Sequence, residues 1–147
     1  MPDIKQSQPG HNKQGNVLAF DYGLRHIGVA VGQTLTGQAR GVATLRAKQG
    51  KVRWQEIEQL IAEYSPLCVV VGFPLNMDGS TSDMSSLAEQ FAQQFTRRYA
   101  LPSYMQDERL TSYVAQDMLA DARALGLGKN DHEIAACLIA QQYLNES

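Results

Sequence analysis

Three acidic residues stand where a carboxylate could take part in phosphodiester chemistry. Asp21 follows the apolar run VLAF, Glu108 comes shortly after SYMQ, and Asp131 stands just before IAACLIA. Hydrolysis by two metals needs several carboxylates that converge on Mg²⁺ or Mn²⁺, because the metals polarise the phosphate, generate hydroxide and stabilise the leaving oxygen. Carboxylate oxygens are the hard ligands that Mg²⁺ takes in proteins. The three acids are therefore candidate metal ligands.

Asp21 and Glu108 also have structural interpretations. Asp21 with Gly23 suits a turn in which the aspartate bonds to its own backbone. Glu108 and Arg109 could form a solvated pair while Asp107 shapes a turn after a strand that ends at residue 106. Taken one at a time, these interpretations stay open beside the catalytic one.

The structural interpretation of Asp131 is a helix start. Asn130 followed by Glu133 resembles a capping box, which places Asp131 in the first helical turn. The helix dipole stabilises an acid at that position whatever the protein does. The neighbouring His132, considered alone, is a surface or packing residue.

The spacing of apolar residues predicts the elements that position these acids. Alternating or continuous apolar runs predict strands over 17–20, 27–31, 39–45, 67–72 and 103–106. Helical spacing predicts helices over about 52–64, 84–95, from Thr111 onward, and 131–144. A loop is expected over 73–80, with Pro74 as a turn residue. The order βββαβαβαα predicts an α/β fold, one mixed five-stranded sheet with helices on both faces. Ligands of such sheets bind beyond the strand ends.

Length and composition predict one domain. The polar residues 1–16 are expected to form a flexible tail, and residues 17–147 a single domain. No apolar run approaches the roughly 20 residues of a membrane span, and the start does not resemble a secretory signal. We therefore expect a cytoplasmic protein with no membrane partner. Cys68 and Cys137 lie in apolar stretches and are expected to be reduced and buried.

The net charge of −2 conceals an uneven distribution. From Tyr22 to Gln55 there is no acidic residue, whereas six cations fall there: Arg25, Arg40, Arg46, Lys48, Lys51 and Arg53. A solvated hairpin and loop would account for such a run. A basic surface that follows phosphate backbones is the alternative, and such a surface can exist on an acidic protein.

Four segments together resemble the YqgF family of Holliday-junction-resolvase-like, pre-16S ribosomal RNA nucleases. They are FDYGLRHIGVAVG, VVGFPLNMDGS, DERLTS and GKNDHEIAACLI, in the family's order and spacing between Asn16 and Tyr143. The resemblance implies a ribonuclease H-like fold that binds Mg²⁺ or Mn²⁺ through Asp21, Glu108 and Asp131.

Four further residues are expected to contact the substrate of such a nuclease. Asn76 belongs to the second segment, which is expected to line the site, and Arg25, Arg109 and Lys129 are expected to contact phosphates. His132 and Glu133 follow Asp131 where the family usually has small or hydroxyl residues. This departure leaves open whether Glu133 assists or replaces Asp131.

These observations favour a metal-dependent endonuclease, acting either on precursor 16S rRNA or on branched DNA as a Holliday junction resolvase. It would work as a monomer or a homodimer. An ATP-binding module of the actin-like kind is a second hypothesis, suggested by Asp21, Gly23 and Gly28, but those proteins close two such domains around the nucleotide. A non-catalytic nucleic-acid-binding assembly factor is the third.

Overall fold

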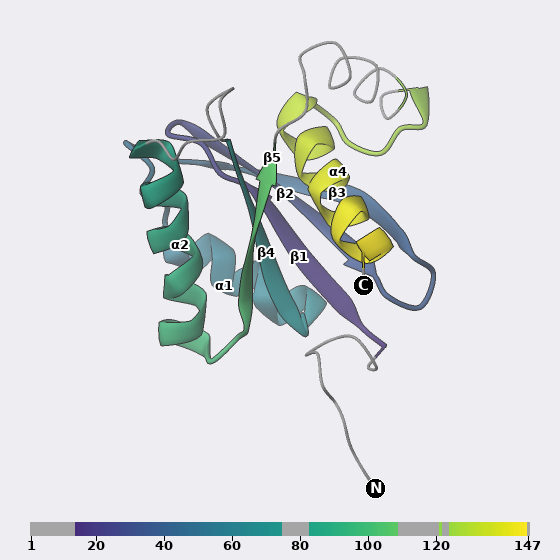
Figure 1. Ribbon diagram of the computed structural model, residues 1–147, viewed down its shortest axis with the longest axis horizontal. Coiled ribbons are helices and arrows are strands. Elements are labelled where there is room, and N and C mark those ends of the chain that lie inside the picture. The colour runs from purple at the N-terminus through teal and green to yellow at the C-terminus, as the bar shows by residue number, and fades with distance from the viewer. Residues whose placement is uncertain (1–13, 75–82, 109–120, 122–123, 147) are drawn as a thin grey trace, which may run out of the picture.

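The computed structural model describes residues 14–74, 83–108, 121 and 124–146, without the side chains of 73–74, 83–84 and 107–108. Residues 16–46 form a three-stranded antiparallel sheet, and the described residues that follow add two strands and three helices to it (Figure 1). The elements are β1 (Asn16–Asp21), β2 (His26–Gln33), β3 (Gln38–Arg46), α1 (Trp54–Tyr64), β4 (Cys68–Pro74), α2 (Asp83–Tyr99), β5 (Ser103–Glu108) and α4 (Asp131–Glu146).

The five strands lie in the order β3-β2-β1-β4-β5. β1 pairs with β2, and β2 with β3, in antiparallel fashion, whereas β1, β4 and β5 run parallel. The ends of β1, β4 and β5 therefore share one edge of the sheet with the end of β3 and the start of β2. We call this the carboxyl edge. The predicted α/β fold with a mixed five-stranded sheet is confirmed.

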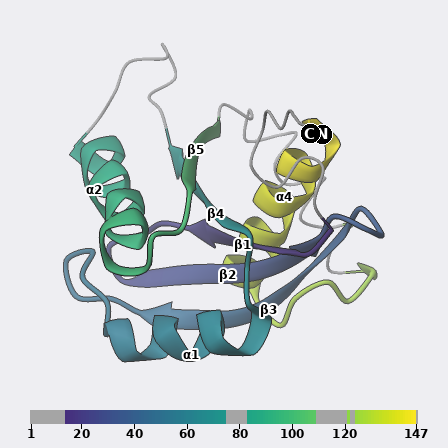
Figure 2. The ribbon, with the colours of Figure 1, turned by 90° about the horizontal axis from the view of Figure 1, so that it is seen from below.

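Helices cover both faces of the sheet, as predicted. Leu18 and Phe20 of β1 pack in a core with α1 and α2, whereas Val17 and Ala19 pack in a second core with α4. In Figure 2, α1 and α4 lie on opposite sides of β1, β2 and β3. β4 is buried on both faces, because Val69 and Val71 join the first core and Val70 the second. This is the burial expected of a parallel central strand.

β4 and β5 are both longer than predicted. Phe73 and Pro74, expected in a loop, pair with Asp107 and Glu108, expected to follow a strand. Both predictions of a strand end were wrong. The turn preference of Pro74 is a local property, whereas the pairing that extends the two strands joins segments distant in sequence.

β1 begins one residue earlier than predicted, at Asn16. The Asn16 side-chain amide donates a hydrogen bond to the Tyr64 carbonyl (2.7 Å), and the Asn16 carbonyl accepts one from the Leu67 N–H (2.8 Å). These long-range bonds place Asn16 in the folded domain and not in the expected tail. Residues 1–13 of that tail lie outside the described residues. Most of the helix expected from Thr111 does so too, and only positions 121 and 124 of it are described, both as helical.

The two cysteines are free and buried, as expected from their apolar surroundings. Burial raises the pKa of the Cys68 thiol and of the Cys137 thiol, so both favour the neutral form. Their Sγ atoms belong to the second core, which also includes Ala136 and Ile139. Within the described part of the chain, no helix combines the length and the apolar character that crossing a bilayer requires.

Candidate active site at the carboxyl edge

Asp21 is the last residue of β1 and its side chain faces α4. Side chains alternate along a strand, so Asp21 follows Val17 and Ala19, which pack against α4. Asp21 stands opposite Gly28 of β2, and Cβ positions of directly opposed residues lie about 4.5–5.5 Å apart. The Asp21 carboxylate is partly exposed. It thus lies at the carboxyl edge, over the start of β2.

The first turn of α4 rests on the backbone of Gly28. A Cβ atom added to Gly28 would overlap the His132 carbonyl oxygen and would lie 3.1 Å from the Glu133 nitrogen. Only a residue without a side chain allows this approach. Because Gly28 is the cross-strand partner of Asp21, the contact brings Asp131, the residue before His132, to the side of Asp21.

Asn130 is the N-cap of α4, as predicted. Its Oδ1 accepts a hydrogen bond from the Glu133 N–H (2.9 Å), and its carbonyl accepts the first helical bond, from the Ile134 N–H (3.0 Å). The Asn130 amide also donates to the Thr44 hydroxyl on β3 (3.1 Å). Asp131 is therefore the first helical residue, and it is exposed at the positive end of the helix dipole.

Glu133 points to β3, away from Asp21. Its carboxylate accepts a hydrogen bond from the Lys129 N–H (3.1 Å), and the Thr44 hydroxyl lies 3.5 Å from its other oxygen. Its side chain is 6% exposed and packs over Gly41, where an added Cβ would lie 2.6 Å from the Glu133 Cβ. Glu133 therefore positions the first turn of α4 and the segment before it.

Replacing Glu133 by Ala should destabilise the protein by about 1–3 kcal/mol, because the Lys129 N–H would lose its buried acceptor. Glu133→Gln keeps an acceptor oxygen and should recover most of that stability together with nuclease activity. Thermal unfolding and cleavage assays on both variants check this. A Glu133→Gln protein that folds with normal stability but is as inactive as an Asp21 variant would instead make Glu133 a metal ligand.

Glu108 ends β5 at the same edge. Asp21 is in register with Gly72, Gly72 with Gln106, and Glu108 pairs with Pro74 beyond them. β5 is two strands from β1, a distance of about 10 Å across the sheet. The backbone of Glu108 thus lies at the carboxyl edge, but its side chain is outside the described residues.

The side-chain atoms that could bind a metal at the carboxyl edge are carboxylate oxygens, which are hard ligands. Among the side chains that the structure describes, no three His, Cys, Asp or Glu residues form a group able to hold a metal. Asp21 and Asp131 both neighbour the contact of α4 with Gly28, and metal binding by them and by Glu108 stays a prediction. Carboxylate oxygens suit Mg²⁺ or Mn²⁺ and do not suit soft metals.

Two of the four predicted substrate contacts lie in the described region. Arg25 is exposed in the connection between β1 and β2, and Lys129 is exposed just before the N-cap of α4. Both are therefore at the carboxyl edge. Asn76 and Arg109 fall outside the described residues.

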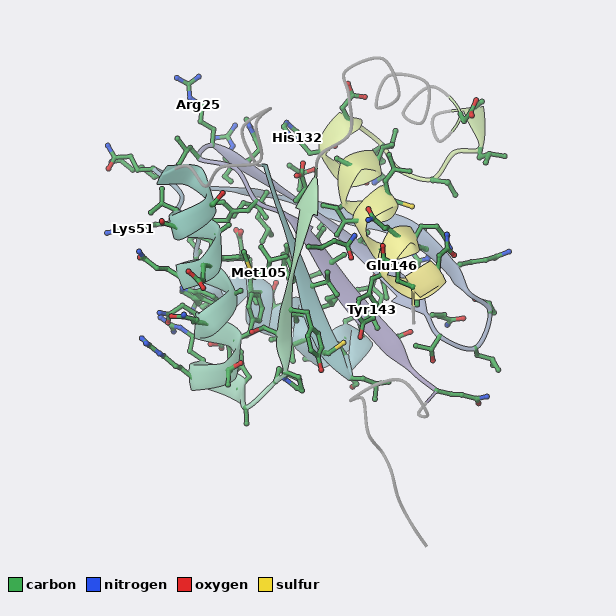
Figure 3. The ribbon with its side chains drawn as sticks, viewed as in Figure 1. Arg25, Lys51, Met105, His132, Tyr143 and Glu146 are labelled. Atoms are coloured by element: carbon green, nitrogen blue, oxygen red, sulfur yellow. The ribbon has the colours of Figure 1, made fainter. Side chains whose placement is uncertain are left out.

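Most of the cations between Tyr22 and Gln55 also gather at this edge. His26 is opposite Arg46 at the end of β3, and the turn that follows carries Lys48 and Lys51. Figure 3 shows Arg25 and Lys51 extending outward on the side of α2, with His132 at the start of α4. We call Arg25, Arg46, Lys48, Lys51 and Arg53 the basic edge. All five are exposed.

Arg40 does not belong to this group. It pairs with Val31 near the start of β3, whereas the basic edge begins at the end of that strand. The expectation of one basic surface from Arg40 to Arg53 was therefore wrong. Arg40 lies near the start of β3 and Arg46 at its end, so the length of this strand separates Arg40 from the basic edge.

A pair of stacked histidines was not foreseen. The rings of His26 and His132 lie 4.8 Å apart between centroids with 23° between their planes. His132 seemed isolated in the sequence because its partner lies on a distant strand. The signal that could have located this contact is Gly28, since a glycine inside a strand often marks close approach of another backbone.

Comparisons with known proteins show the family to which the chain is similar. A family model described as Holliday junction resolvase, RuvX, matches residues 15–146. A protein of Pseudomonas fluorescens (strain SBW25) named "Putative pre-16S rRNA nuclease" is 47% identical over 134 residues, covering 89% of this chain and 92% of that protein. A Pseudomonas putida protein of the same name is 47% identical over 131 residues, covering 87% and 93%.

Solved structures share the fold at low sequence identity. RuvC of T. thermophilus, in complex with a Holliday junction substrate, has a TM-score of 0.54 at 15% identity, covering 86% of this chain and 90% of that one. The Holliday junction resolvase of fowlpox virus has a TM-score of 0.57 at 11% identity, covering 89% and 98%. These likenesses concern the fold alone, which is ribonuclease H-like.

Proposed function

The chain belongs to the RuvX family of Holliday junction resolvases and is a nuclease, and on that premise we propose that it is a metal-dependent endonuclease that processes the 5′ end of precursor 16S rRNA in the cytoplasm. The observation that carries the proposal is the contact of Gly28, the register partner of Asp21, with the His132 carbonyl next to Asp131. Asp21 and Asp131 come from opposite ends of the chain, and each is a neighbour of this contact.

Each residue of the site has a task in this reaction. Asp21 and Asp131, with Glu108 as the expected third ligand, would hold Mg²⁺ or Mn²⁺, which when bound activates water and stabilises the leaving oxygen. Lys129 and Arg25, both exposed at the carboxyl edge, would orient the phosphate backbone. The basic edge would hold the flanking strand by contacts to phosphates, which do not depend on base sequence.

The choice of precursor rRNA as substrate rests on the relatives. Those named for pre-16S rRNA share 46–48% of their residues with nearly the whole chain, whereas the resolvase structures share 15% or less. Cleavage of a Holliday junction is the second candidate, and the family description favours it. A symmetric junction needs two copies of the chain, whereas a single cut in RNA needs one.

Both candidates are tested by one experiment. The purified protein is incubated with a 5′ fragment of precursor 16S rRNA and with a four-way DNA junction, each with Mn²⁺ or with EDTA. We expect cutting of the RNA fragment with Mn²⁺ and none with EDTA. Cutting of the junction alone would make resolution the function. Binding of either substrate without any cutting would overturn the endonuclease proposal in favour of a binding factor.

A further inference from the structure

A cavity lies on the face of the sheet opposite α4, between α2 and the turn that follows β3. Its volume is about 420 Å³, within the range of small-molecule sites. Three aromatic side chains contribute to its lining: Tyr22, Trp54 and Phe91. Two cations and three amides also line it: Lys51, Arg98, Gln49, Gln90 and Gln94.

The turn that forms one wall is held in place by Tyr22. The Tyr22 hydroxyl donates a hydrogen bond to the Gly50 carbonyl (2.9 Å), and the Gly50 N–H donates to the Leu24 carbonyl (2.9 Å). Gly50 has a φ of 83°, and an added Cβ would overlap the Tyr22 hydroxyl. The wall is therefore built into the fold.

Tyr22 also connects the cavity to the active site. Asp21 faces α4, whereas Tyr22, the next residue, belongs to the core beneath α1 and α2. Two consecutive residues at the end of β1 therefore lie on opposite faces of the sheet. Asp21, the candidate metal ligand, is on the face covered by α4, and Tyr22 is in the wall of the cavity on the other face. A strand of nucleic acid bound at Asp21 can reach the cavity by passing over the carboxyl edge, where Lys48 and Lys51 stand.

The chemistry of the lining suits a nucleotide. No carboxylate is among the described residues that line the cavity, and Lys51 and Arg98 supply two positive charges for a phosphate. The Arg98 guanidinium lies 4.5 Å from the centre of the Trp54 ring, and guanidinium and aromatic groups both stack on bases. The glutamine side chains offer donors and acceptors for base edges.

We propose that this cavity binds one unpaired nucleotide of the substrate strand, close to the phosphate that is cut at Asp21. The inference rests on the proposed nuclease function and adds a requirement for a single-stranded segment beside the cleavage site. Base stacking on aromatic groups tolerates any sequence, so the cavity selects unpaired over paired nucleotides and not one base over another.

Trp54 makes the test direct, because it is the single tryptophan of the chain. The protein is titrated in EDTA with single-stranded deca-uridylate, with the same strand paired to deca-adenylate, and with UMP, while Trp54 emission and the anisotropy of labelled strands are followed. We expect the single strand to quench Trp54 and the duplex to leave it unchanged. Arg98→Gln should weaken single-strand binding about fivefold, whereas the adjacent Arg97→Gln, outside the cavity, should not.

Three results would overturn the proposal: binding of the single strand by anisotropy without a change in Trp54 emission, equal weakening by the Arg97 and Arg98 variants, or tighter binding of UMP than of the single strand. The EDTA titration is independent of catalysis. Quenching of Trp54 without metal-dependent cleavage would overturn the proposed nuclease function and support nucleotide binding in the cavity. Metal-dependent cleavage without quenching would support the nuclease function and overturn nucleotide binding in the cavity.

Discussion

Asp21→Asn should lower metal-dependent cleavage by about 10³-fold or more while the protein stays folded. The substitution preserves the size of the side chain and removes the charge that holds the metal, whose stabilisation of the transition state amounts to several kcal/mol, or about tenfold in rate per 1.4 kcal/mol. Asp21 is partly exposed at a strand end, so the core is undisturbed. Single-turnover cleavage of the precursor rRNA fragment with Mn²⁺ measures the loss.

A second readout separates metal binding from a general loss of charge. Mn²⁺ should raise the melting temperature of the unmodified protein, since a ligand that binds the native state stabilises it, and this rise should disappear in Asp21→Asn. Glu63→Gln, which removes an exposed acid from α1, is the matched control and should behave as the unmodified protein. Cleavage by Asp21→Asn within tenfold of normal would show that Asp21 is not a metal ligand.

Gly28→Ala should reduce cleavage by about 10²-fold and destabilise the protein by about 1–3 kcal/mol. The new methyl group would overlap the His132 carbonyl oxygen, so the first turn of α4 must lift from β2. This displacement carries Asp131 away from Asp21. Cleavage is measured well below the melting temperature, where the variant is folded, so that the activity loss reflects geometry.

Gly32→Ala provides the control on the same strand and the same face. There the added Cβ meets the Leu144 Cδ1 at 3.0 Å, and the end of a leucine side chain can move. We therefore expect near-normal cleavage from Gly32→Ala. If Gly28→Ala cleaves as well as Gly32→Ala, the contact of α4 with β2 does not set the distance between the two acids.

The sequence by itself determined the local features of this protein. Strand and helix types follow from apolar spacing, which depends on neighbours a few residues apart. The cap of α4 was predictable for the same reason, because Asn130 and Glu133 are one helical turn apart. The four family segments also placed Asp21 and Asp131 among the candidate ligands before any geometry was known.

Only the tertiary structure decided which of these features meet. Apolar spacing carries no register, so the pairing of Asp21 with Gly28, and of Phe73 with Asp107, could not be read from it. Glu133 is another example, because its contact with Thr44 on β3 joins residues remote in the chain.

The cavity beside Tyr22 likewise needs a strand end, a turn and α2 in one place. Sequence pattern reports the burial of single residues, whereas a site depends on packing between segments that the pattern treats separately. The chemistry of this protein was therefore visible in its sequence as separate residues, and their assembly at the carboxyl edge was decided by long-range packing.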